Sequence, residues 1–201
     1  MRTFLRTFVI SVSMVALAAP ALPAVIDFEA QSAGRGGVFT GGLDSPLTID
    51  VATFTGGELL RGEVGLSANQ TGVYATWLFT SGATNPLVIT FSTPVTGFSV
   101  QVFNGGESQN YTVSSNLGES IVRSIGTAGS GGSSTFALAG ALTRVEVLGA
   151  SAGFNFAIDN VTYGAVPEPG TAGLLAAATC LLVIWRFSGA GFRRGLSTPP
   201  R

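Results

Sequence analysis

The stretch Phe154–Tyr163, which reads FNFAIDNVTY, decides the fold that the sequence predicts. Its apolar residues alternate with smaller or polar ones as far as Ile158, as the residues of a half-buried β-strand do. Val161 and Tyr163 have the opposite parity, so a regular strand would turn them to the other face. A β-bulge at Asp159–Asn160 would return both sets to one core, and we therefore predict a bulged strand here.

Working outward from this stretch, the same alternation recurs through residues 25–164, which we predict to be one domain. At its start, Ile26 and Phe28 point one way and the acidic residues between and after them point the other. Further alternating runs are Leu47–Val51, Val73–Phe79, Leu87–Phe91, Phe98–Val102 and Arg144–Val147. Turn residues separate the runs, and about nine to eleven short strands predict an all-β, two-sheet sandwich, within that class a jelly roll.

Composition excludes several chemistries. The chain has 201 residues, a formal charge of −1, one Cys and no His, and all 10 basic residues are Arg. Imidazole catalysis, a Schiff-base lysine and an intrachain disulfide are thus excluded. Residues 25–164 carry four Arg against ten Asp and Glu, a net charge of −6 that argues against a nucleic-acid partner. We accordingly expect no catalytic residues and a domain that is not an enzyme.

The two ends of the chain carry apolar runs outside this domain. Residues 1–24 have Arg2 and Arg6 before an apolar segment and a small-residue cleavage site at Ala19–Ala21, as a secretory signal peptide does. Near the other end, an apolar run over about 170–186 predicts a single transmembrane helix with its basic flank in the cytoplasm. The alternative for each run is a buried helix of the domain itself.

The C-terminal segment 165–201 resembles a PEP-CTERM sorting signal, because a Pro-Glu-Pro tripeptide, an apolar helix and a basic cluster follow in that order. The residues that match are Pro167, Glu168 and Pro169 in the motif and Arg186, Arg193 and Arg194 in the basic tail. The resemblance implies an exosortase as partner. It also implies export by the Sec machinery, transient anchoring in the inner membrane, and delivery to the surface or exopolysaccharide biofilm matrix of a Gram-negative bacterium.

The ends of the domain resemble those of carbohydrate-binding-module-like jelly rolls, which open on a Phe-Glu pair and close on Ile-Asp-Asn-Val. The resemblance implies that the first and last strands lie side by side, and that Glu29 and Asp159 hold a structural calcium. The alternative is that both carboxylates are solvated at a sheet edge. No other cofactor is expected.

For the domain itself, the sequence favours a non-enzymatic surface or matrix component that associates with polysaccharide. The alternation along Val73–Phe79 assigns Trp77 to the core face and leaves Tyr74 on the opposite face to stack on sugar rings. The alternative is an extracellular glycan-active enzyme that uses paired carboxylates, such as Glu58 with Glu63 or Glu107 with Glu119. The G-x-S-x-G match around Ser151 has no base to activate it and is interpreted as a loop.

Overall fold

The computed structural model describes residues 22–40, 42–61, 72–127 and 132–165, and these residues form strands and turns without a helix. The strands are β1 (Ala24–Ile26), β2 (Leu47–Ile49), β3 (Ala52–Thr55), β4 (Glu58–Arg61), β5 (Gly72–Trp77), β6 (Leu87–Asn104), β7 (Gln109–Ser115), β8 (Ser120–Ile125), β9 (Ser133–Leu138), β10 (Leu142–Gly149) and β11 (Asn155–Ala165). All the strand pairs are antiparallel, which confirms the all-β class.

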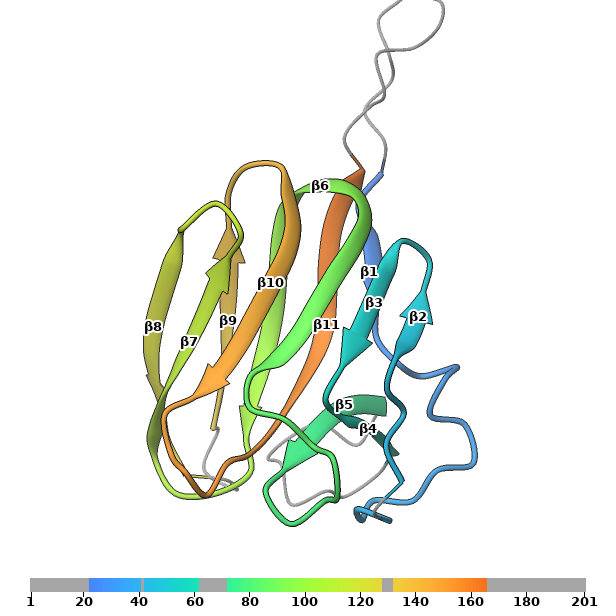
Figure 1. The fold of residues 1–201 in the computed structure, drawn as a ribbon, viewed down its shortest axis with the longest axis vertical. Coiled ribbons are helices and arrows are strands. Elements are labelled where there is room, and N and C mark those ends of the chain that lie inside the picture. The colour runs from blue at the N-terminus through green and yellow to red at the C-terminus, as the bar shows by residue number, and fades with distance from the viewer. Residues whose placement is uncertain (1–21, 41, 62–71, 128–131, 166–201) are drawn as a thin grey trace, which may run out of the picture. The chain divides into compact units, whose positions relative to one another are not determined.

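The strands form two layers that share β6 (Figure 1). In the first layer, the first part of β6 (Leu87–Phe91) pairs with β3 and β10, and β2, β7 and β8 extend the sheet. In the second layer, the last part of β6 (Phe98–Asn104) pairs with β9 on one side and β11 on the other. β11 also pairs with β1 and β5, and β5 pairs with β4. Gly97 lies between the two parts at φ 59°, a conformation that glycine adopts readily where β6 crosses between layers.

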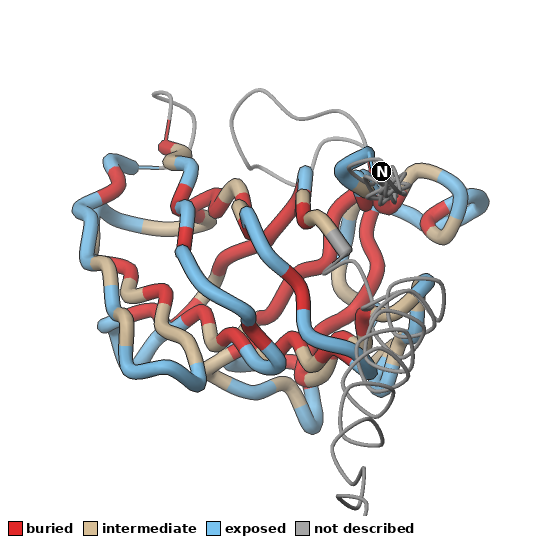
Figure 2. Tube along the Cα trace, turned by 90° about the horizontal axis from the view of Figure 1, so that it is seen from above, coloured by how far each residue is buried: buried red, intermediate tan, exposed pale blue. Residues whose placement is uncertain are grey.

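The main core lies between the layers and takes alternate residues from both parts of β6 (Figure 2). In β6, the buried apolar side chains of the main core are Leu87, Ile89, Phe91, Val95, Phe98, Val100 and Val102. Val145 and Val147 of β10 face the same core. The predicted alternation is therefore confirmed for the runs Leu87–Phe91, Phe98–Val102 and Arg144–Val147. Each such side chain stabilises the fold by roughly 1.5–3 kcal/mol through burial.

The predicted bulge is present in β11. Its register against β6 shifts between Asp159 and Thr162, and Asn160 has a φ of 50°. As a result Ile158, Val161 and Tyr163 are all buried in the main core although their parities differ. Asn tolerates this left-handed conformation better than most residues, which explains why the parity switch falls here.

The first strand lies beside the last one, as the jelly-roll resemblance implies. β1 pairs with the part of β11 beyond the bulge, with Ile26 opposite Val161. Ile26 and Phe28 are buried, while Asp27 is exposed and Glu29 is half-buried, which confirms the predicted faces.

The outer face of the second layer is also buried, which the sequence did not predict. Leu60, Val73, Ala75, Phe103 and Ala157 form a second apolar cluster there, named here the outer cluster. β5 is therefore buried on both faces: Val73 and Ala75 lie in the outer cluster, and it is Tyr74 that enters the main core.

Several predicted features fall outside the described residues. These are residues 1–21 of the signal peptide, the motif Pro167, Glu168 and Pro169, the apolar run 170–186, and Arg186, Arg193 and Arg194. Within the described ranges, the chain has no helix that is long and apolar enough to cross a membrane.

Candidate functional site

Tyr74 is not a sugar-stacking residue, contrary to the sequence prediction. Its side chain is 0% exposed, and its ring packs against Phe28 and Phe54 at centroid distances of 6.0 and 5.7 Å. Its hydroxyl accepts a hydrogen bond from the Gly57 amide at 3.0 Å and donates one to the Asp44 carbonyl at 3.1 Å. Burial raises the pKa of Tyr74 to about 12, so the phenol stays neutral. The hydroxyl is thus satisfied inside the core, which is why an amphipathic Tyr could point inward.

Partly exposed rings lie instead where β5 ends. Trp77, the last residue of β5, contacts Phe39 at a centroid distance of 5.4 Å and Phe79 at 5.1 Å. Phe79 is 76% exposed, whereas Trp77 and Phe39 are half-buried. These three residues, named here the ring cluster, present aromatic surface to solvent beside the end of β5.

A buried carboxylate holds the loop that carries Phe39. Glu58 is 1% exposed and lies opposite Ala75 in the register of β4 and β5, two residues from Trp77 on the same face. Its Oε1 accepts a hydrogen bond from the Thr40 amide at 2.9 Å and another from the Thr40 hydroxyl. Glu58 Oε2 is buried without a hydrogen-bond partner among the described residues. Glu58 is therefore a positioning residue that fixes Thr40 and, with it, the neighbouring Phe39.

The same loop is fastened to β4 a second time through Asp44. The Asp44 amide donates to the Gly57 carbonyl at 3.1 Å, and Asp44 Oδ2 accepts from the Leu59 amide at 2.8 Å. Arg35 forms an ion pair with Asp44 Oδ1. On the other side of Phe39, the Arg61 amide donates to the Gly36 carbonyl at 3.0 Å, so the loop is fixed both before and after Phe39. The ring cluster would therefore lose little conformational freedom when a ligand binds.

A polar recess lies among the loops that lead into β7 and β11. It has a volume of about 290 Å³ and is lined by Gly106, Glu107, Ser108, Gln109, Ser151 and Gly153. Buried Asn104 shapes it, because its Oδ1 accepts from the Gly106 amide at 3.0 Å and from the Tyr111 hydroxyl at 2.8 Å. Gln109 Oε1 accepts from the Ser151 amide at 2.9 Å, which joins the two loops. Ser151 lies in the loop between β10 and β11, as the sequence predicts.

The ring cluster and the polar recess lie at the same end of the sandwich, the lower end in Figure 1. Asn155 stands opposite Trp77 in the register and donates from Nδ2 to the Gly105 carbonyl at 2.9 Å, beside the recess. The Leu78 amide donates to the Phe154 carbonyl at 2.9 Å, and Phe154 follows Gly153 of the recess. One segment, residues 153–155, thus connects the two features.

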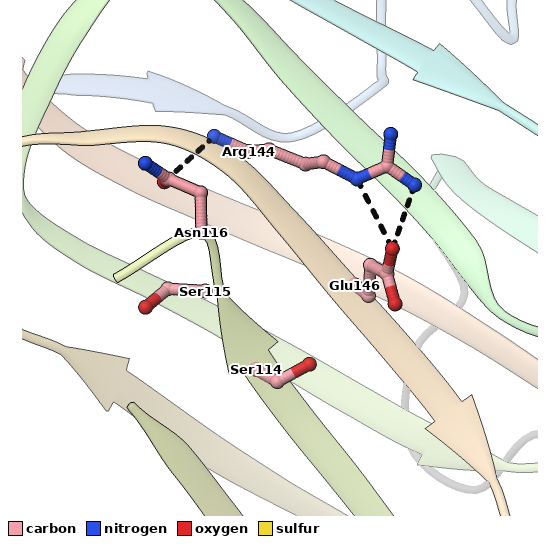
Figure 3. Close-up of a pocket in the computed structure, with 5 residues that line it drawn as sticks. All are labelled: Ser114, Ser115, Asn116, Arg144 and Glu146. Atoms are coloured by element: carbon pink, nitrogen blue, oxygen red, sulfur yellow. Dashed lines mark hydrogen bonds and ion pairs between the residues drawn. The ribbon is translucent and has the colours of Figure 1, made fainter. Parts of the chain in front are cut away.

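A second, smaller hollow of about 150 Å³ lies on the first layer between β7 and β10 (Figure 3). Arg144 donates from Nε and Nη2 to Glu146 Oε1 at 3.0 and 2.6 Å. Asn116 Oδ1 accepts from the amides of Thr143 and Arg144 at 3.0 and 3.1 Å. These groups satisfy one another and no aromatic ring lines this hollow, so the ring cluster and the recess form the stronger candidate site.

The structure places both predicted calcium ligands near the start of β5. Glu29 Oε1 accepts from the Gly72 amide at 2.9 Å, and Glu29 Oε2 lies 3.3 Å from Arg61 Nη2. Asp159 is 2% exposed and accepts from the Asn160 amide and side chain at 2.6 and 3.2 Å. A set of three or more acidic, His or Cys side chains that could hold a metal is not found in the described part of the chain. Calcium at Glu29 and Asp159 stays a prediction.

Of the two carboxylate pairs named in the sequence analysis, only Glu107 with Glu119 lies wholly within the described residues. Glu63 lies outside them. Glu107 and Glu119 flank opposite ends of the seven-residue strand β7, which places them about 20 Å apart at the usual rise per residue. Glycoside hydrolysis needs its two carboxyl groups within about 5–10 Å. Glu107 and Glu119 are therefore too far apart to act together as the paired carboxylates of the alternative.

Sequence reasoning missed Phe39, did not single out Phe79, and named Glu107 only as one member of a carboxylate pair. Phe39 and Phe79 lie outside the strands, and periodicity gives no information about residues in loops. The available indication was an apolar strand that runs into a loop with Trp77 and Phe79 at its end. Nothing in the sequence indicates that residue 39 folds back onto residue 77.

No protein-family model matches this sequence, and a comparison with curated proteins finds no match. Among solved structures, an exo-β-1,3-galactanase from Phanerochaete chrysosporium is similar, with 18% sequence identity and a TM-score of 0.32. The match covers 58% of this chain and 30% of the galactanase chain. The CBM22-1 and GH10 modules of a Clostridium thermocellum endo-1,4-β-D-xylanase match with 14% identity, 74% of this chain, 29% of that chain and a TM-score of 0.39. The enzymatically active domain of bacteriophage CBA120 tailspike protein 4 matches with 15% identity, 61% of this chain, 18% of that chain and a TM-score of 0.31. The chain thus spans less than a third of these matched chains.

These matches correct one expectation, namely that the domain is not an enzyme. The matched proteins are described as a galactanase, xylanase modules and an enzymatically active domain, and the absence of His and Lys does not by itself exclude an enzyme. The physical reason is that glycoside hydrolysis needs only carboxylates, and this chain keeps them.

Proposed function

We propose that the domain binds a polysaccharide at the ring cluster. The observation that supports this most is Phe79, whose ring is 76% exposed although Trp77 packs against it at 5.1 Å. An exposed aromatic side chain has a cost in water and is a common feature of recognition surfaces. Sugar rings have apolar C–H faces that stack on aromatic rings, and their hydroxyls bind polar groups at the rim.

The rim supplies those polar groups. Thr40 is exposed beside Phe39, and Asn155 stands opposite Trp77. A site with a few aromatic rings and neighbouring polar groups has the general composition of small-ligand and glycan sites. The loop contacts of Glu58 and Asp44 hold this arrangement before a ligand arrives.

We further propose that the fold is a jelly roll and that the chain is exported and sorted by an exosortase to the cell surface or matrix. Pairing of β1 with β11 and the sharing of β6 between layers support the jelly roll. The N-terminal apolar run and the Pro-Glu-Pro motif followed by an apolar run and Arg residues support the sorting.

The test compares polysaccharide binding by the full-length protein and two variants. Phe79→Ala removes the exposed ring and is expected to weaken binding at least tenfold without lowering the melting temperature. Val122→Ala, at a 59% exposed apolar residue of β8, is the matched control and is expected to bind normally. Normal binding by Phe79→Ala would contradict the proposal. Release of reducing ends is measured in the same samples to show whether the bound chain is also hydrolysed.

A further inference from the structure

We infer that the site continues from the ring cluster into the polar recess and selects an uncharged polysaccharide over an anionic one. This inference rests on the proposed function and adds the chemical class of the ligand. It follows from the continuity of the two features, the groups that line the recess, and the charges at this end of the sandwich.

The two features are adjacent because residues 153–155 connect them. Gly153 lines the recess, the Phe154 carbonyl binds the amide next to Trp77, and Asn155 stands opposite Trp77. A chain of sugar rings stacked on Phe79 and Trp77 would meet the recess at its next units. A volume of about 290 Å³ is near the lower end of the range for small-ligand sites.

The recess offers groups that bind neutral hydroxyls. Glu107 is exposed and presents carboxylate oxygens, which accept hydrogen bonds from sugar hydroxyls. Ser151 Oγ accepts from the Gly153 amide at 3.1 Å, so its hydroxyl proton can be donated to a ligand. Both groups suit a polyhydroxylated chain.

The charges at this end disfavour an anionic chain. Glu107 carries its charge at the recess, and the Glu58 carboxylate lies behind the ring cluster. The four Arg of the described residues are engaged elsewhere or paired. Arg35 pairs with Asp44, Arg61 with Glu29 and Arg144 with Glu146, and Arg123 lies over the Phe136 ring at 5.6 Å. None of these Arg side chains lines the recess, so a uronate or sulfate group bound there would meet the Glu107 carboxylate.

The experiment measures binding of the full-length protein to soluble β-glucan and dextran, which are uncharged, and to alginate, a polyuronate. At low ionic strength, we expect at least one uncharged chain to bind at least tenfold more tightly than alginate. High salt should narrow this difference, because screening weakens the repulsion. Alginate binding equal to or tighter than that of both uncharged chains would overturn the inference while leaving the proposed function intact.

Two variants locate the source of the selectivity. Glu107→Gln removes the negative charge at the recess and is expected to raise alginate affinity about threefold to tenfold at low salt. Glu119→Gln makes the same charge change beyond the other end of β7 and is expected to leave alginate binding unchanged. Equal effects of the two variants would overturn the role of the recess. Failure to bind any of the three polysaccharides, or normal binding by Phe79→Ala, would instead contradict the proposed function.

Discussion

The two outer faces of the sandwich are built from strands of the same kind yet differ in what lies on them. On the first layer, the aligned row of Thr48, Thr53, Thr90 and Arg144 is exposed or half-buried. On the second layer, the aligned row of Glu58, Ala75, Ala157 and Phe103 is at most 3% exposed. The first face follows the usual alternation of an antiparallel sheet with one solvated side, and the second does not.

The difference shows where this domain can hold a ligand. The first face carries hydroxyls and a self-paired Arg144 and Glu146. On the second face, the loop through Phe39 and Thr40 packs onto β4 and β5, and this packing creates the ring cluster. A covered face therefore contributes both an additional apolar cluster and the partly exposed rings at its margin.

The sharpest test of this comparison is to remove one apolar side chain from each face. Phe103→Ala empties part of the outer cluster and is expected to lower the free energy of unfolding by about 3–5 kcal/mol. Val122→Ala, on the solvated face, is expected to change it by less than about 0.5 kcal/mol. Urea unfolding of both variants decides the matter, and equal losses would show that the two faces do not differ in packing.

A second test removes one carboxylate from each face. Glu58→Ala removes the carboxylate that accepts hydrogen bonds from Thr40 and is expected to lower the free energy of unfolding by about 1–3 kcal/mol. It is also expected to weaken polysaccharide binding, because Phe39 beside Thr40 would no longer be held in place. Glu146→Ala breaks a half-exposed ion pair with Arg144 and is expected to cost less than about 1 kcal/mol. Denaturant unfolding and binding assays on both variants measure this, and full binding by Glu58→Ala would disprove its positioning role.

A third test uses alkaline pH to check that the Tyr74 side of β5 faces the main core. Folding raises the pKa of Tyr74 from 10.0 to about 12 because burial disfavours the phenolate. The neutral form is therefore favoured in the folded state, and its stabilising contribution, present below pH 10, is lost as the pH rises through about 12. Tyr74 alone should lower the unfolding free energy by up to about 3 kcal/mol over this range, at about 1.4 kcal/mol per pKa unit. Tyr74→Phe should fall less steeply, and equal slopes for both proteins would contradict the assignment.

The smallest expected effect concerns the predicted calcium, whose ligands Glu29 and Asp159 belong to the second layer and its edge. If calcium is held there, a chelator should lower the melting temperature of the full-length protein by a few degrees, about 1 kcal/mol of stability. Asp159→Ala should abolish the difference, whereas Glu146→Gln should keep it. Identical melting curves with chelator and with added calcium would contradict the prediction that Glu29 and Asp159 hold calcium.

The comparison also explains which parts of the structure could be predicted from the sequence. The bulge in β11 was predictable because Ile158 and Val161 cannot share a core on a regular strand. The faces of β5 were not, because a strand buried on both sides has no polar side from which to read its orientation. Tyr74 looked like a surface residue since its hydroxyl was expected in water, whereas the Gly57 amide and Asp44 carbonyl satisfy it inside.

The candidate site was less predictable than the fold. Trp77 and Phe79 are visible in the sequence, yet their exposure depends on a loop that contacts β4 through Thr40 and Glu58, residues 18 positions apart. The recess likewise depends on Gln109 meeting Ser151 across 42 positions. Contacts of this kind arise from tertiary packing and leave no periodic pattern in the sequence.

The pairing of β1 with β11 brings the two ends of the described domain together. The chain enters at Ala24 opposite Tyr163 and leaves the described part at Ala165, so both connections emerge at one end, the upper end in Figure 1. β11 runs 11 residues from Asn155, beside the ring cluster, to that exit, a length of about 35 Å. The ring cluster therefore lies at the end of the domain opposite Ala24 and Ala165, so a polymer bound there would be clear of the points where the described chain begins and leaves.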